Sequence, residues 1–258
     1  LYSEGGNVTL DSTSKINTGS NKAVGVFTKG TGQTITANAG STMTIGDSSF
    51  GFLNEGKGNT INSNVANQTL RNDGTYIYSS DKSGTVNNNT TLTSTGSYNY
   101  GLYSAGTVTN NADINFGTGL GNVGIYSTYG GRATNLAGRN ITVGASYKDP
   151  TDPLKDRYAV GMAAGFNGDG NPAKAYTGTV VNEGTINVNG QYSIGMYGTE
   201  AGTKVYNGTS KGSAATINLG ASNTTGMYLD NGAYGYNYGT IRSTGTGLSK
   251  VVGVVVKN

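Results

Sequence analysis

The sequence has no cysteine and no histidine, only three prolines, and charged side chains at only 12% of its 258 positions. The absence of Cys excludes disulfides, thiolate nucleophiles and cysteine-bound zinc, and the absence of His excludes Ser-His-Asp triads and histidine-bound metals. A chain without Cys also suits export in an extended state through an oxidising compartment. Most classes of enzyme are therefore excluded before any motif is considered.

Charge and hydropathy exclude two further classes of interaction. The formal net charge of +3 comes from scattered Lys and Arg, so there is no basic stripe for a nucleic acid and we expect none as a partner. No window approaches the ~20 consecutive apolar residues of a membrane span, so we expect no direct membrane insertion of this segment.

Glycine is abundant, at 44 residues, and it recurs in phase with apolar and aromatic residues. The clearest example is Tyr100-Gly101-Leu102-Tyr103, and Leu1-Tyr2 matches the second half of this motif, so we expect the chain to be part of a longer protein. The Gly position of the motif falls at Gly25, Gly51, Tyr76, Gly101, Gly124, Gly161, Gly195, Gly226 and Gly253. The intervals are 26, 25, 25 and 23 residues, then 37, 34, 31 and 27. A period near 25 that lengthens without losing its motif is typical of a solenoid.

Each repeat contains three short apolar segments, which predicts three strands per coil. In the repeat that begins at Tyr100, Val108 follows the motif and then Ile114 with Phe116. Segments rich in Val, Ile, Thr and Tyr between Gly- and Asn-rich turns predict an all-β chain. We therefore expect a single domain over residues 1–258, an elongated parallel β-helix of roughly nine coils of about 25 residues, with coils about 4.8 Å apart.

Alternation along the strands assigns an inward and an outward face. The residues predicted to point inward are Val26, Phe52, Ile77, Leu102, Ile125, Met162, Met196 and Met227. The motif glycines are explained as corners that bend sharply or take positive φ. Asn110 and Asn182 are explained by left-handed corners and by stacking on the Asn of the next coil.

The residues that follow the inward column are mostly aromatic and are predicted to form an outward column. They are Phe27, Leu53, Tyr78, Tyr103, Tyr126, Ala163, Tyr197 and Tyr228. Ring stacking between coils explains this column without a ligand and is the favoured interpretation; a flat aromatic strip for sugar rings or a protein partner is the alternative. The interruption at Ala163 coincides with the looped coils and predicts a shallow site there.

The longer coils predict loop insertions around residues 145–158, 166–175 and 206–214. Solenoids commonly place recognition in loops on a rigid scaffold, whereas insertions without function are an alternative of equal weight. The candidate partner contacts are Tyr147, Lys148, Lys155, Arg157, Tyr158, Asn167, Asp169, Tyr126 and Tyr197.

Catalytic, cofactor and metal sites are not predicted, and we expect no enzyme. The 14 acidic residues are scattered, and the one cluster, Asp149, Asp152 and Asp156, is interleaved with Lys and Arg, which is typical of a solvated loop. β-Helical polysaccharide lyases and hydrolases instead need carboxylates that converge on one wall. Residues 167–171 alternate oxygen ligands like a calcium loop but lack its terminal bidentate acid, so a Gly-rich turn is favoured.

The motifs, together with the connecting segment Gly-Thr-Ile-Asn-Val-Asn-Gly at residues 184–190, resemble the passenger region of large type V autotransporters. The motifs are most similar to those of the fusobacterial outer-membrane adhesins, and the resemblance covers the whole chain. It implies a right-handed β-helix on the cell surface, held at the outer membrane by a C-terminal β-barrel that this sequence lacks. It also implies adhesion to host cells or other bacteria through glycans or protein receptors, and it carries over no ligand residues.

Three hypotheses follow. The leading one is a surface adhesin segment whose looped coils and tyrosine face contact a glycan or a receptor. The second is a stalk that acts by length and stiffness and displays a distal adhesive or toxin domain, as the regular coils of residues 1–124 favour. The third is a polysaccharide-degrading enzyme, which would require converging carboxylates.

Overall fold

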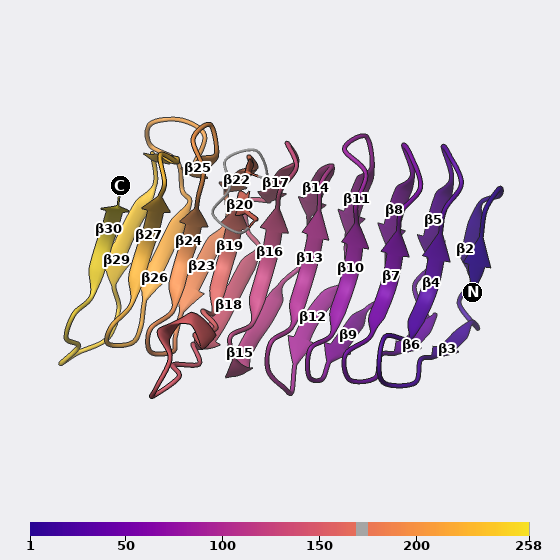
Figure 1. Cartoon of the computed structure of the whole chain (residues 1–258), viewed down its shortest axis with the longest axis horizontal. Helices are drawn as coiled ribbons and strands as arrows, with labels where there is room; N and C mark the ends of the chain where they lie inside the picture. The colour runs from indigo at the N-terminus through magenta and orange to yellow at the C-terminus, as the bar shows by residue number, and fades with distance from the viewer. Residues whose placement is uncertain (169–174, 258) are drawn as a thin grey trace.

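The computed structural model describes residues 1–168 and 175–257, which form one elongated stack of coils (Figure 1). Within these residues, nine three-strand coils follow one another and β30 begins a tenth. This parallel β-solenoid confirms the predicted all-β fold, whereas its right-handed winding stays a prediction. In the described part of the chain the only helix is the short 3-10 helix η1 (Pro153–Lys155), and no helix there is long and apolar enough to cross a membrane.

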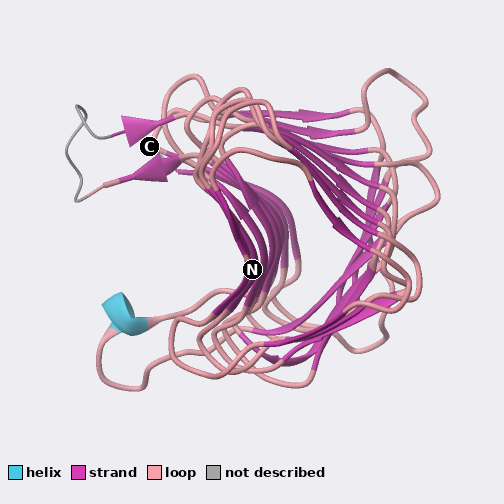
Figure 2. Ribbon diagram, turned by 90° about the vertical axis from the view of Figure 1, so that its right-hand side faces the viewer, coloured by secondary structure: helices cyan, strands magenta, loops and turns pink. Residues whose placement is uncertain are grey.

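The strands form three parallel sheets, which Figure 2 shows nearly end-on. The first sheet contains β1 (Tyr2–Ser3), β4 (Val24–Thr28), β7 (Phe50–Asn54), β10 (Thr75–Ser79), β13 (Tyr100–Ser104), β16 (Val123–Ser127), β19 (Val160–Ala164), β24 (Ile194–Gly198), β27 (Thr225–Asp230) and β30 (Val252–Lys257). The second contains β2 (Val8–Leu10), β5 (Thr34–Ala37), β8 (Thr60–Ser63), β11 (Thr85–Asn88), β14 (Thr107–Asn110), β17 (Arg132–Asn135), β22 (Thr179–Asn182), β25 (Lys204–Asn207) and β28 (Tyr234–Asn237). The third contains β9 (Asn67–Leu70), β12 (Thr91–Ser94), β15 (Ile114–Leu120), β18 (Asn140–Ala145), β23 (Thr185–Val188), β26 (Thr216–Leu219) and β29 (Thr240–Ser243), while β3 (Lys15–Asn17) and β6 (Thr42–Thr44) pair separately.

The core runs along the axis of the stack. All eight residues predicted to point inward are at most 1% exposed. Equivalent residues face one another in register across neighbouring coils, so that Met196 lies between Met162 and Met227. The alternation argument therefore placed the core of the first sheet correctly.

The motif glycines have a different physical reason from the one predicted. Those from Gly25 to Gly226 lie inside strands of the first sheet, and none has positive φ. A Cβ atom on them would instead lie 2.4–2.7 Å from a backbone carbonyl oxygen of the next coil, and on Gly195 it would also lie 2.7 Å from Cγ2 of Ile217. Glycine is favoured at these positions because the coils approach closely, and the corner explanation is wrong.

A recurrent left-handed corner lies two residues before most strands of the first sheet. The residues at this position with φ between 52° and 66° are Lys22, Ser48, Asp73, Tyr98, Gly121, Tyr192, Asn223 and Lys250. The backbone N–H groups of Lys22 and Asn223, for example, donate to carbonyl oxygens of the next coil at 2.7 and 2.9 Å. Such bonds hold non-Gly residues in a conformation that is otherwise unfavourable.

Tyr76 replaces the motif glycine in one coil and is completely buried. Its hydroxyl lies 2.6 Å from Ser63 Oγ, and its ring meets Phe52 edge-on at 5.6 Å between centroids. Burial raises the pKa of Tyr76, because the phenolate would lose its hydration. The side chain therefore becomes part of the core.

A ladder of asparagines, all buried except Asn237, ends the second-sheet strands from β11 to β28. Each side-chain amide donates to the side-chain oxygen of the next coil at 2.7–3.0 Å, through Asn88, Asn110, Asn135, Asn182, Asn207 and Asn237. The predicted stacking is confirmed. The predicted left-handed φ is wrong for Asn110 and Asn182, because these residues end extended strands.

Candidate functional site

The outer face of the first sheet carries a second apolar cluster, separate from the core. Val123, Val160, Ala163 and Ile194 are nearly buried there although their strands turn them away from the axis. The side chains of Tyr126, Tyr197 and Tyr228 pack against them. The motif residues that form this face, from Val24 to Val255, are all uncharged, so the sheet offers an apolar and aromatic surface.

The outward aromatic column is a real stack, but an interrupted one. Tyr78 and Tyr103 are stacked with centroids 4.8 Å apart, and Tyr126 meets Tyr103 edge-on at 4.9 Å. Ala163 follows in register, and the column resumes with Tyr197 against Tyr228 at 6.0 Å. Removing one ring from the column leaves space on the surface.

Two insertions border this face, one at each end of β19. The first connects β18 to β19 and contains η1, whereas the second follows β19 and contains the hairpin β20 (Phe166–Asn167) and β21 (Ala175–Tyr176). Figure 2 shows η1 and the hairpin projecting on the same side of the first sheet, from its opposite edges. The two insertions therefore border the face on two sides. We call the insertion between β18 and β19 the first wall and the insertion that contains β20 and β21 the second wall.

The first wall is folded by local hydrogen bonds. Tyr147 and Arg157 pair as an antiparallel bridge with N···O distances of 2.9 and 3.0 Å, and Asp152 caps η1 through the N–H of Leu154. Ser146 Oγ donates to the carbonyl oxygen of Tyr192 at 2.8 Å. The loop is thereby attached to the next coil.

Its charges are largely paired within the loop. Lys148 forms an ion pair with Asp156, donates to the Tyr158 hydroxyl at 3.0 Å and lies 4.9 Å from the Tyr158 ring centroid. The hydrogen bond from Lys148 holds the pKa of Asp156 below its usual value, and hydrogen bonds from Thr151 do the same for Asp149. These carboxylates organise the loop, as predicted for a self-compensated cluster.

The second wall is attached to the tyrosine column. The hydroxyl of Tyr126 donates to the carbonyl oxygen of Gly165, directly before β20, at 2.7 Å. Tyr176 of β21 packs against Tyr129 at 4.2 Å between centroids and is parallel to Phe166 at 6.4 Å. Burial raises the pKa of Tyr126, so its hydroxyl stays a donor at neutral pH.

Two pockets lie on this face and share Tyr197; the larger is bordered by Lys148 and Tyr158 of the first wall and the smaller by Phe166 of the second. The larger, of about 560 Å³, lies over the coils of β19, β24 and β27. Its lining residues are Lys148, Tyr158, Val160, Tyr192, Ile194, Tyr197, Asn223, Thr225, Tyr228, Asp230 and Lys257. The smaller, of about 340 Å³, is lined by Tyr100, Tyr103, Val123, Tyr126, Ala163, Phe166 and Tyr197.

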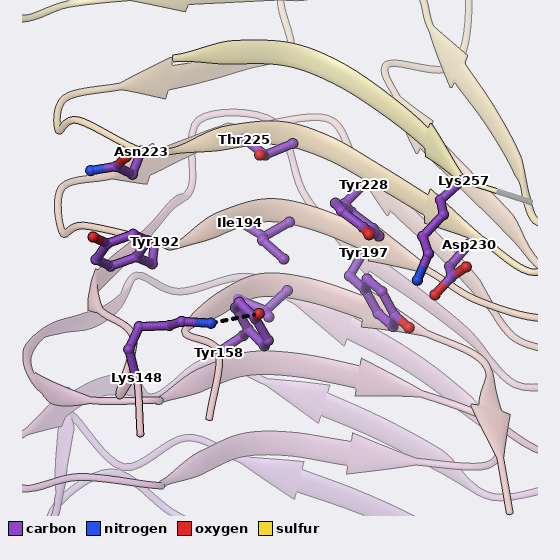
Figure 3. Close-up of a pocket in the computed structure, with 11 residues that line it drawn as sticks. Lys148, Tyr158, Tyr192, Ile194, Tyr197, Asn223, Thr225, Tyr228, Asp230 and Lys257 are labelled. Carbon is purple, nitrogen blue, oxygen red and sulfur yellow. Dashed lines mark hydrogen bonds between the residues drawn. The ribbon is translucent and has the colours of Figure 1, made fainter. Parts of the chain in front are cut away.

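Figure 3 shows how the larger pocket is built. Ile194 and Thr225 lie on its floor, with Tyr192 and Tyr158 on one side and Tyr197 and Tyr228 on the other. The left-handed corner places Tyr192 beside the floor, because it turns the chain just before β24. The pocket therefore has aromatic sides and an apolar floor.

The candidate contacts divide into three groups. Lys148, Tyr158 and Tyr197 line the larger pocket, and Tyr126 with Tyr197 lines the smaller one. The structure does not bring Tyr147, Lys155 or Arg157 into either pocket; Lys155 forms a 3.6 Å ion pair with Asp152. Asn167 lies in β20, and Asp169 lies outside the described residues, as does most of the calcium-like segment.

Sequence reasoning did not identify most residues of the larger pocket's floor, nor Tyr192 at its side or Phe166 in the smaller pocket. Ile194, Thr225, Tyr192 and Phe166 were not candidates, since the first two occupy ordinary motif positions. The recurring position two residues before each motif was the available signal for Tyr192. The third insertion, around 206–214, connects β25 to β26 and so leaves from another corner of the coil, away from the first sheet.

No group of three or more acidic residues that could hold a metal ion occurs among residues 1–168 and 175–257. Three carboxylates of the first wall, those of Asp149, Asp152 and Asp156, accept hydrogen bonds from the loop itself. What the outer face offers chemically is a set of rings, hydroxyls and one amide around a mostly apolar floor, with Lys148, Asp230 and Lys257 at the border of the larger pocket. That set is suited to binding.

Residues 1–245 match the family model described as the BigA third pectate lyase-like domain. Comparison with curated proteins and with solved structures gives no match. The family match spans the whole of both walls and both pockets except for Lys257.

Proposed function

The chain belongs to the family of the BigA third pectate lyase-like domain, and on that basis we propose that it is a β-helical passenger segment of a bacterial surface adhesin. Attachment to host cells or other bacteria takes place through the outer face of its first sheet. The observation that carries the proposal is the placement of two insertions at opposite ends of β19, on either side of a largely apolar, tyrosine-rich face. The fusobacterial type and anchoring at the outer membrane are parts of this proposal.

The proposed activity is binding without catalysis. The acidic cluster of the first wall is used by its own loop, and the larger pocket contains Asp230 as its single carboxylate among the described residues. Polysaccharide cleavage on a β-helix requires several converging carboxylates, with or without a metal.

The test compares the 258-residue chain with two trimmed variants on intact epithelial and bacterial cells. In the first, residues 148–156 are replaced by Gly-Gly, which keeps the Tyr147–Arg157 bridge at the base of the wall. In the second, residues 208–213 are removed from the third insertion as a matched control. We expect saturable cell binding that is lost in the first variant and kept in the second.

A stalk is the second candidate function. The observation in its favour is the regular stacking of the coils from β4 to β16, which carry no large insertion. If the well-folded chain and both variants bind no cell, the adhesin proposal fails for this segment and the stalk takes its place.

A further inference from the structure

We propose that the larger pocket binds a neutral pyranose unit of a surface glycan. The inference deepens the proposed function by naming the chemical class that this face recognises. It rests on the arrangement of rings and uncharged polar groups around the floor of Ile194 and Thr225, and on the ion pair that Lys148 forms with Asp156.

The rings come first. Tyr158 and Tyr192 are on one side of the floor and Tyr197 and Tyr228 on the other (Figure 3). The C–H faces of a pyranose pack on aromatic rings through the same dispersion and quadrupole interactions that ring edges use. A pocket of about 560 Å³ is within the range of about 300–1,000 Å³ that is usual for small-ligand sites.

The polar groups distinguish a sugar from an apolar peptide side chain. The pocket is lined by tyrosine hydroxyls, the hydroxyl of Thr225 and the amide of Asn223, each of which both donates and accepts. Burial raises the pKa of Tyr197, so its hydroxyl stays protonated at neutral pH. Sugar hydroxyls would satisfy these groups, whereas an apolar side chain would cover them without a partner, at a cost in affinity.

The charges distinguish a neutral sugar from an acidic one. Lys148 is already paired with Asp156, and Lys257 lies opposite Asp230 in the register of β27 and β30. Binding a carboxylate in this pocket would require breaking one of these arrangements or desolvating the acid unpaired. A neutral unit needs neither.

The experiment measures binding of the 258-residue chain to methyl β-D-galactopyranoside, methyl β-D-glucopyranoside and lactose, with 3′-sialyllactose and galacturonic acid as acidic comparators, by saturation-transfer NMR. The variants are Tyr192→Gly, which suits the positive φ at this position, and Tyr228→Ala. The matched control is Tyr234→Ala, an exposed tyrosine on β28 of the second sheet. We expect at least one neutral probe to bind, the two pocket variants to lose about 3- to 10-fold in affinity, and the control to be unchanged.

Further outcomes test the neutral assignment and separate the two proposals. Stronger binding of the acidic probes, or loss of neutral binding in Lys148→Gln, overturns the assignment of a neutral ligand. If no sugar probe binds while the chain still binds cells through the first wall, only the sugar assignment fails. If the sugar binds but cells do not, the pocket assignment stands and the adhesin proposal fails.

Discussion

The asparagine ladder allows a stability prediction to be worked out from single atoms. The side-chain amide of Asn135 accepts from Asn110 at 2.8 Å and donates to Oδ1 of Asn182 at 3.0 Å and to the carbonyl oxygen of Arg139 at 3.3 Å. In Asn135→Ala the Asn110 amide keeps its second bond, to the Ala112 carbonyl oxygen at 2.7 Å. Oδ1 of Asn182, which is fully buried, loses its donor.

An orphaned buried acceptor costs about 1–3 kcal/mol, and the space left by the amide adds to it. We therefore expect Asn135→Ala to lower the free energy of unfolding by about 2–4 kcal/mol, a large part of the roughly 5–15 kcal/mol of a typical domain. Urea unfolding followed by far-UV circular dichroism measures the loss. Amide hydrogen exchange in β17 and β22 shows whether the opening begins at this coil, as a solenoid built from neighbour contacts predicts.

The control uses the same chemistry at the surface. Asn89 donates to Asn64 at 2.8 Å and accepts from Asn111 at 3.0 Å, but these side chains are exposed and water can replace them. Asn89→Ala is expected to change stability by less than about 0.5 kcal/mol. Equal losses in Asn135→Ala and Asn89→Ala would refute the argument that burial makes the inner ladder stabilising.

Three more predictions concern the same stack. Gly195→Ala should lower the free energy of unfolding by about 1–3 kcal/mol, measured in urea, because the new Cβ lies 2.6 Å from a carbonyl oxygen of the next coil. Gly19→Ala, whose new Cβ has no atom within 4 Å, should leave stability unchanged, and the reverse order would contradict the close-approach explanation. Met196→Asp buries an unpaired carboxylate and should lower the free energy of unfolding by several kcal/mol in the same assay. Asn187→Asp, on the outer face, should lower it only slightly, and equal effects would mean that the inward assignment is wrong. Burial raises the pKa of Tyr126 above its usual 10.0, so the unfolded chain ionises first at this residue, and its contribution to stability should be constant from pH 8 to about pH 10 and fall above it. Melting curves from pH 8 to 11.5 with absorbance at 295 nm check this, and a melting temperature that does not fall above pH 10 would contradict it.

The sequence was sufficient for the features that repeat. The three-strand coil, the inward column and the outward aromatic column follow from alternation, because a side chain in a stacked coil has one neighbour above and one below. Sequence reasoning failed for the motif glycines, because it assigned their presence to the wrong physical cause. Glycine at the motif was assigned to a positive-φ corner, whereas Gly195 is favoured because of a carbonyl oxygen in another coil that no local pattern shows.

The pockets could be predicted only in part, for a related reason. Ala163 was identified as a gap because the column has a period, but Ile194 and Thr225 look like any other motif residues. They become a floor only because the first wall rises beside them and Tyr192 is turned toward them by its left-handed corner. The sequence predicted a loop whose Lys and Arg compensate its acids, but the specific pairing of Lys148 with Asp156 depends on how the loop folds back.

The departures from the repeat are concentrated in the coil of β19. This coil has Ala163 in the tyrosine column, an insertion at each end of its first-sheet strand, and Tyr158, without positive φ, at the corner position. Its inward residue, Met162, nevertheless pairs in register with Ile125 and Met196 like any other coil. The core constrains only the inward side chains and the glycines, so the outer face and corners of one coil can change without disturbing the stack. Trimming the first wall should therefore alter recognition while leaving the unfolding free energy nearly unchanged, and a trimmed variant that fails to fold would show that the wall also supports the coil.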